Sequence, residues 1–92
     1  MNSGVVVIIL NPMGDVVAEA SDFDRAGYGG FTLKQAQAYR AEKVALNRFV
    51  ADHLNKWLGT GVEDYFIDAF WNNAQRAGYT LKTISIGYDD ER

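Results

Sequence analysis

Few side chains of this chain could perform chemistry, and its single histidine is the first to consider. His53 lies on the apolar side of a predicted helix, beside Val50 and Trp57. That position favours a packed, hydrogen-bonded histidine over a catalytic base or a pH switch. The absence of Cys excludes thiolate catalysis, disulfides and Cys-based zinc sites, and the scattered serines do not support a Ser-His-Asp arrangement. The sequence therefore predicts a protein that is not an enzyme and needs no cofactor.

Two groups of oxygen-bearing side chains could hold a hard cation. Asp64 and Asp68 are four residues apart on a predicted helix with Asn72 one turn further, and Asp22 and Asp24 lie close together in an extended segment. Carboxylates at such spacings are more typical of a solvated surface. We therefore predict no metal site.

A glycine-rich segment and a basic helix favour an alternative, which is a small nucleic-acid-binding or nucleotide-binding domain. Gly27, Gly29 and Gly30 precede a helix, as in anion-binding loops, although neither G-x-G-x-x-G nor the Walker A pattern is present. Phosphates or an acidic partner would be contacted by four basic residues on the exposed side of the long helix, which are Lys34, Arg40, Arg48 and Lys56.

Charge is segregated along the chain, which has a net charge of −3. Residues 1–31 carry four Asp and Glu against one Arg, whereas residues 32–59 carry five Lys and Arg against two acidic residues. Either the basic helix packs against acidic neighbours, or it presents a positive stripe to phosphates or an acidic partner.

Five elements are expected to position these residues. Residues 5–10 are uniformly Val, Ile and Leu, which predicts a buried central strand. Residues 11–14 (Asn-Pro-Met-Gly) match a type I turn with Gly at positive φ, and residues 16–21 follow as an antiparallel edge strand. Helices are expected at 32–58 and 62–77, the first with a Thr32/Gln35 capping box and the second ending at Gly78, and residues 79–88 read as the third strand.

The long helix has a predicted apolar stripe on one face. Its members, taken at 100° per residue, are Tyr39, Leu46, Phe49, Val50, His53, Leu54 and Trp57.

These elements predict a single α+β domain over residues 1–92 with the order ββααβ. We expect a three-stranded sheet of order 2-1-3 with a long and a shorter helix packed on one face. If the two helices form an antiparallel hairpin, the third strand runs parallel to the first. The set Val5, Val7 and Ile9 and the set Val6, Ile8 and Leu10 cannot both face the helices. One set must be covered by the glycine-rich segment at 22–31, by a partner or by a second copy.

The second helix is apolar over more of its circumference than one packing face requires. Trp71 either belongs to the core or, with Ile67 and Tyr65, forms an exposed anchor for a protein partner. We take the anchor as the partner-binding hypothesis.

As a whole chain, the short, Cys-free, acidic and aromatic-rich ββααβ profile resembles small phage-encoded or prophage-encoded accessory proteins of the anti-CRISPR type. The resemblance concerns size and style over all 92 residues and transfers no site residues. It implies a stoichiometric inhibitor that blocks a host defence complex. The expected function is thus a non-enzymatic protein-interaction module, cytoplasmic and without a membrane span; a structural homodimer is the remaining alternative.

Overall fold

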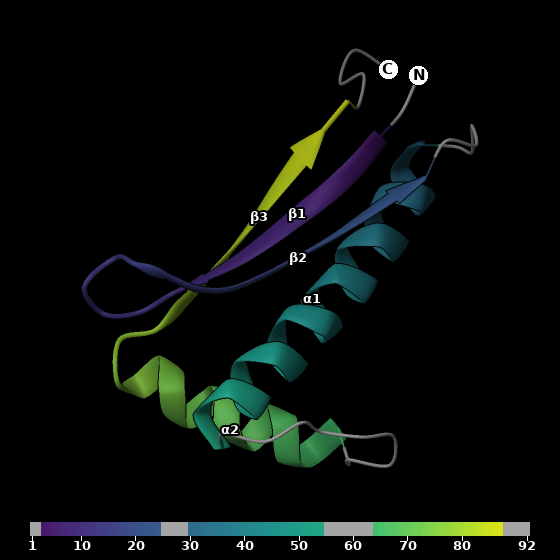
Figure 1. Ribbon diagram of the computed structural model, residues 1–92. Coiled ribbons are helices and arrows are strands. Elements are labelled where there is room, and N and C mark those ends of the chain that lie inside the picture. Colours follow the sequence, from purple (N-terminus) through teal and green to yellow (C-terminus); the bar gives the residue numbers. More distant parts are fainter. Residues whose placement is uncertain (1–2, 25–29, 55–63, 88–92) are drawn as a thin grey trace.

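The computed structural model describes residues 3–24, 30–54 and 64–87, and it confirms the ββααβ order (Figure 1). The elements are β1 (Ser3–Leu10), β2 (Val16–Asp24), α1 (Gly30–Leu54), α2 (Asp64–Arg76) and β3 (Thr80–Ile86). The three strands form one sheet in the predicted order β2-β1-β3. Both helices lie on the same side of this sheet (Figure 1).

The hairpin between β1 and β2 follows directly from the local sequence. Gly14 donates its N–H to the carbonyl of Asn11, closing the predicted type I turn, and Gly14 has φ 91°. The Asn11 side chain Oδ1 also accepts hydrogen bonds from the backbone N–H groups of Met13 and Asp15, each at 2.9 Å. The register between the strands shifts after Ile9, which marks a β-bulge.

The direction of β3 corrects the expectation from sequence, because β3 runs antiparallel to β1 rather than parallel to it. The prediction assumed that α2 runs back along α1. With 13 residues against 25, α2 is about 20 Å long and α1 about 38 Å, so α2 is too short to retrace α1. Instead α2 lies across the C-terminal end of α1, and the chain enters β3 at that same end of the sheet (Figure 1).

The buried side of α1 winds around the helix instead of keeping to one arc. Its fully or nearly fully buried residues include Leu33, Gln37, Ala41, Ala45 and Phe49, which are spaced four apart. Each step of four residues advances about 40° around the axis, so the buried side turns along the helix. The predicted stripe is therefore only partly right.

The members of that stripe separate according to this winding. Phe49 and Val50 are buried, whereas Tyr39 is 62% exposed and Leu54 is 39% exposed. Small alanines occupy the middle of the buried line, where α1 lies across the sheet. Residues 55–63, which hold Trp57, lie outside the described residues, as does the side chain of Thr32.

The C-terminus of α2 is closed by a motif that the sequence indicated through Gly78. Tyr79 donates its N–H to the carbonyl of Ala74, and Gly78 donates to that of Gln75, which is the Schellman pattern. Gly78 has φ 105° and therefore a conformation that L side chains rarely adopt. The motif places the Tyr79 ring 5.2 Å from that of Phe49, so the end of the helix is joined to the core.

Candidate interaction surface

The histidine does not occupy the core position expected from sequence. His53 is exposed in the last turn of α1, although it follows Phe49 in the line of residues spaced four apart. Its ring still contacts the rings of Phe49, Phe70 and Tyr79, at centroid distances of 4.4, 5.6 and 5.7 Å. Its Nδ1 lies 3.2 Å from the Phe49 carbonyl oxygen, so this ring nitrogen is engaged within its own helix.

The candidate cation ligands are not brought together. Among the described residues, His, Cys, Asp and Glu side chains nowhere form the group of three or more that would hold a metal ion. The Asp22 carboxylate accepts a hydrogen bond from Arg40 instead. The side chains of Asp24 and Asp64, like the glycine segment at 25–29, lie outside the described residues.

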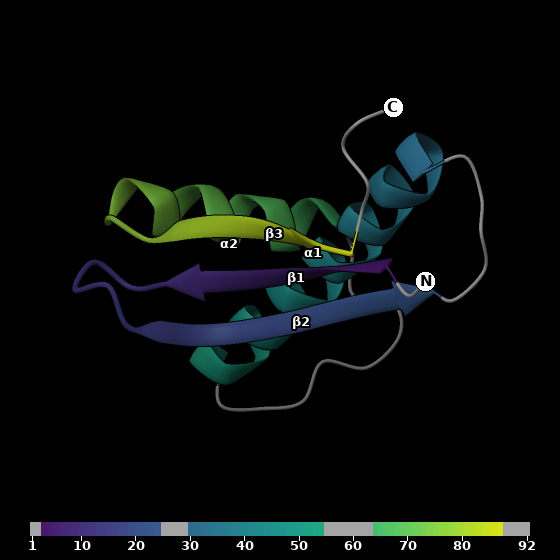
Figure 2. The ribbon, with the colours of Figure 1, turned by 90° about the horizontal axis from the view of Figure 1, so that it is seen from above.

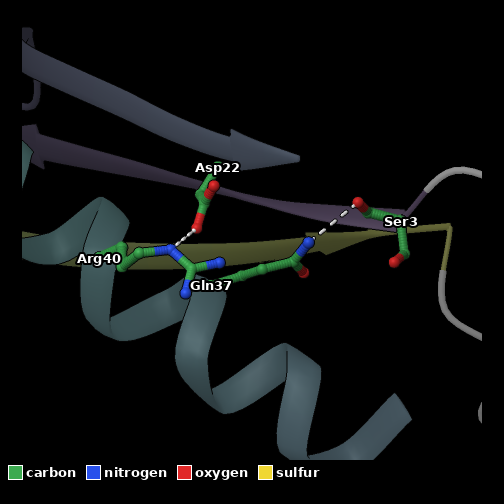
Figure 3. Close-up of polar contacts among 4 residues, drawn as sticks. All are labelled: Ser3, Asp22, Gln37 and Arg40. Atoms are coloured by element: carbon green, nitrogen blue, oxygen red, sulfur yellow. Dashed lines mark hydrogen bonds and ion pairs between the residues drawn. The ribbon is translucent and has the colours of Figure 1, made fainter. Parts of the chain in front are cut away.

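Arginines of α1 pack against the acidic strand β2. Arg40 Nε pairs with Asp22 Oδ2 (Figure 3), and Arg48 Nη1 donates a 2.8 Å hydrogen bond to the Glu19 carbonyl oxygen. Lys43 lies over the Tyr39 ring at 5.4 Å. Of these contacts, only the Arg40–Asp22 pair joins the basic helix to an acidic side chain, since Arg48 bonds a backbone carbonyl and Lys43 contacts a residue of its own helix.

The two remaining candidates for phosphate contact are the lysines Lys34 and Lys56. Lys34 is half-buried and has an interaction partner, and Lys56 lies outside the described residues.

Gln37 adds a buried polar contact between α1 and the first strand. It is 0% exposed, and its Nε2 donates to the Ser3 carbonyl oxygen at 3.2 Å (Figure 3). This hydrogen bond positions the N-terminal half of α1 against the start of β1.

The exposed anchor predicted on α2 is not formed. Ile67 and Trp71 are only 7% and 9% exposed, and Trp71 meets Phe49 edge to face at a centroid distance of 5.5 Å. With Ala74 these two residues lie three or four positions apart and so share the side of α2 that enters the core. Only Tyr65 is exposed, at 74%, and it lies outside the core cluster.

An apolar surface lies instead on the side of the sheet opposite the helices, which Figure 2 views directly. Directly paired residues of neighbouring strands share a face. Val5, Val7 and Ile9 are 0% exposed and face the helices. The other face, called the outer face below, consists of Val6, Ile8 and Leu10 of β1, Val16, Glu19, Ser21 and Phe23 of β2, and Thr80, Lys82, Ile84 and Ile86 of β3.

Exposure of the outer face is greatest on its two edge strands. Val16, Phe23, Ile84 and Ile86 are between 44% and 54% exposed, whereas the central Val6, Ile8 and Leu10 are half-buried between their neighbours. No described helix or strand covers this face (Figure 2). The apolar side chains of the outer face adjoin one another through β1, which makes them unlike single surface residues, which need no explanation.

Gly4 fixes the position of the Phe23 ring at one end of the outer face. The two residues are directly paired, and a Cβ added to Gly4 would collide with the ring of Phe23. An aromatic ring that lies over a glycine of the neighbouring strand covers the backbone there. Gly4 is accordingly buried, while Phe23 keeps 53% of its surface exposed.

The outer face also carries one charge of each sign, at the same level of the sheet. Glu19 of β2 and Lys82 of β3 are both directly paired with Ile8, so they flank it from opposite edges. Neither charged group forms an ion pair with another described residue. The sequence had left open which set of β1 faces away from the helices.

Comparison of the chain with protein-family models, with curated protein sequences and with solved structures finds no match. None of the helices in the described ranges has the length and apolar character required to cross a bilayer.

Proposed function

We propose that this protein is a non-enzymatic interaction module that binds a protein partner through the outer face. The observation that carries the proposal is the group of apolar side chains on the side that the helices leave uncovered, which are exposed on β2 and β3 and half-buried on β1. An apolar surface of this kind, with two polar residues on each edge strand, is typical of protein interaction sites. The face lies on hydrogen-bonded strands, so little conformational entropy would be lost on binding.

Within that function, the target we propose is a host defence complex, which the protein would block in the manner of a phage-encoded inhibitor. An inhibitor that acts by occupying a site needs a rigid binding surface and no reacting groups. The whole-chain resemblance supports this target, and the outer face supplies the surface. Because the contact is mainly apolar, binding should change little between about 0.05 and 0.5 M salt, where exposed ion pairs are progressively screened.

The test is an affinity pull-down from source-cell lysate with two matched variants. Ile84→Glu places a charge in the outer face, whereas Val44→Glu makes a comparable change at an exposed aliphatic residue of α1. Far-UV circular dichroism would first establish that both variants are folded. We expect one stoichiometric protein to be captured by the wild type and by Val44→Glu, and to be lost with Ile84→Glu.

Two results would count against the proposal. Equal capture by both variants would move the binding surface away from the outer face. Recovery of nucleic acid alone, lost on nuclease treatment and in the Arg40→Glu/Arg48→Glu variant, would favour the nucleic-acid alternative, whose affinity should fall steeply with salt.

A further inference from the structure

We infer that the outer face is self-complementary, and that two copies of this chain bind through it around a twofold axis parallel to β1. The inference rests on the outer face being the interaction surface proposed above, and it names a second copy as the first partner. Two three-stranded sheets would then pack face to face, about 10 Å apart, as in a β-sandwich. Any other protein that binds this face must displace the second copy.

The positions of the two charges select this axis. Glu19 and Lys82 flank Ile8 from opposite edges of the sheet. A twofold axis along β1 places β2 of one copy over β3 of the other, so each Glu19 faces the partner's Lys82. An axis across the strands near Ile8 would place β2 over β2 and bring like charges together, which is unfavourable.

The same axis also matches the apolar residues. Phe23 and Ile86 are both directly paired with Gly4, and the Phe23 ring lies over that glycine, so the axis brings the Phe23 rings of the two copies together between their Ile86 side chains. These two side chains are 53% and 44% exposed in the single chain. Val6 and Ile8 lie on the axis and would meet their own copies. The contact is therefore apolar along its centre. Its edges hold the two ion pairs, together with Ser21 and Thr80, which face the partner's Ile84 and the partner's Val16.

The size of the outer face bounds the affinity. Strand spacing and rise per residue give a face of roughly 14 Å by 25 Å. Two such faces bury on the order of 1,000 Å² in total, near the lower limit for specific interfaces. We therefore expect a reversible dimer with a dissociation constant on the order of 10 µM rather than an obligate one.

Charge exchange tests the geometry independently of the apolar contact. The variants are Glu19→Lys, Lys82→Glu and the double exchange, measured by sedimentation equilibrium from about 1 to 500 µM. Arg48 binds the backbone carbonyl of Glu19 and not its carboxylate, so Glu19→Lys leaves that hydrogen bond in place. The double exchange keeps the net charge of the chain at −3 and so controls for overall repulsion.

We expect each single variant to dimerise roughly tenfold more weakly than the wild type, because two ion pairs become two like-charge pairs. The double exchange should restore the wild-type constant. An equimolar mixture of the two single variants should also restore it, since each contact then again joins opposite charges. Ile84→Glu should abolish the dimer, and Val44→Glu should leave it unchanged.

A wild type that stays monomeric at 500 µM, single variants that dimerise like the wild type, or a double exchange without recovery would overturn the inference. These results are separable from the proposed function. A monomer that loses its lysate partner on Ile84→Glu would refute the second copy and retain the interaction module. A dimer with the expected charge pattern but no captured protein would support the second copy and refute the host target.

Discussion

Replacement of Trp71 by Ala should strongly lower the unfolding free energy and Tm of the protein, because this side chain is a central core residue. Trp71 is 9% exposed and packs edge to face on Phe49, which itself is 1% exposed. Removing the indole ring would leave a cavity between α2 and α1 that the surrounding side chains could fill only in part. An exposed partner anchor, by contrast, would be lost at almost no cost in stability.

The expected cost is about 3–5 kcal/mol, the range for truncating a buried Phe or Trp to Ala. A chain of this length has a total unfolding free energy of roughly 5–14 kcal/mol, so the loss is a large fraction of it. For a domain of this size, each kcal/mol of lost unfolding free energy lowers Tm by about 4–8 °C. The expected decrease in Tm is therefore at least roughly 12 °C.

The assay is urea unfolding followed by far-UV circular dichroism, because the substitution itself removes a fluorophore. Tyr65→Ala is the matched control, since Tyr65 lies on the same helix and is 74% exposed; it should change the unfolding free energy by no more than about 0.5 kcal/mol. A cost below about 1 kcal/mol for Trp71→Ala, equal to that of the control, would refute the placement of Trp71 in the core.

Two further substitutions test single contacts of the fold by the same unfolding assay. Gly78→Ala should cost about 1–2 kcal/mol of unfolding free energy, because φ is 105° and the new Cβ would lie 3.1 Å from Pro12 Cβ. The control Gly14→Ala should cost less, because Gly14 has φ 91° but open space around it. Equal costs would contradict a role for the Pro12 contact. Gln37→Leu should cost about 1–3 kcal/mol by removing the buried donor to Ser3, whereas no loss would show that this hydrogen bond contributes nothing net.

Short-range features of the fold could be read from the sequence because their causes are local. The turn at 11–14 needs only proline's fixed φ, an Asn side chain that bonds its own backbone, and Gly14 at positive φ. The end of α2 needs only Gly78 at C′. The uniformly apolar β1 likewise predicted a central strand, which fixed the sheet order.

The sequence predicted only part of the candidate surface. The sequence showed that one set of β1 side chains must face away from the helices, because alternate side chains of a strand point to opposite faces. Which set it is depended on how α1 lies across the sheet. The pairing of β3 with β1 then decided that Ile84 and Ile86 join this face. Trp71 was misplaced for the same kind of reason, since its burial depends on the position of Phe49.

By itself, then, the sequence determined the order of the elements, the central strand, the hairpin turn and the helix stop at Gly78, all of which depend on neighbouring residues. Only the tertiary structure decided the direction of β3, the winding of the buried side of α1, the exposure of His53 and the burial of Trp71. The physical reason is that helical periodicity fixes which residues share an arc and not which arc is covered. That choice belongs to the crossing of α1 over the sheet and to α2, which is too short to run back along α1.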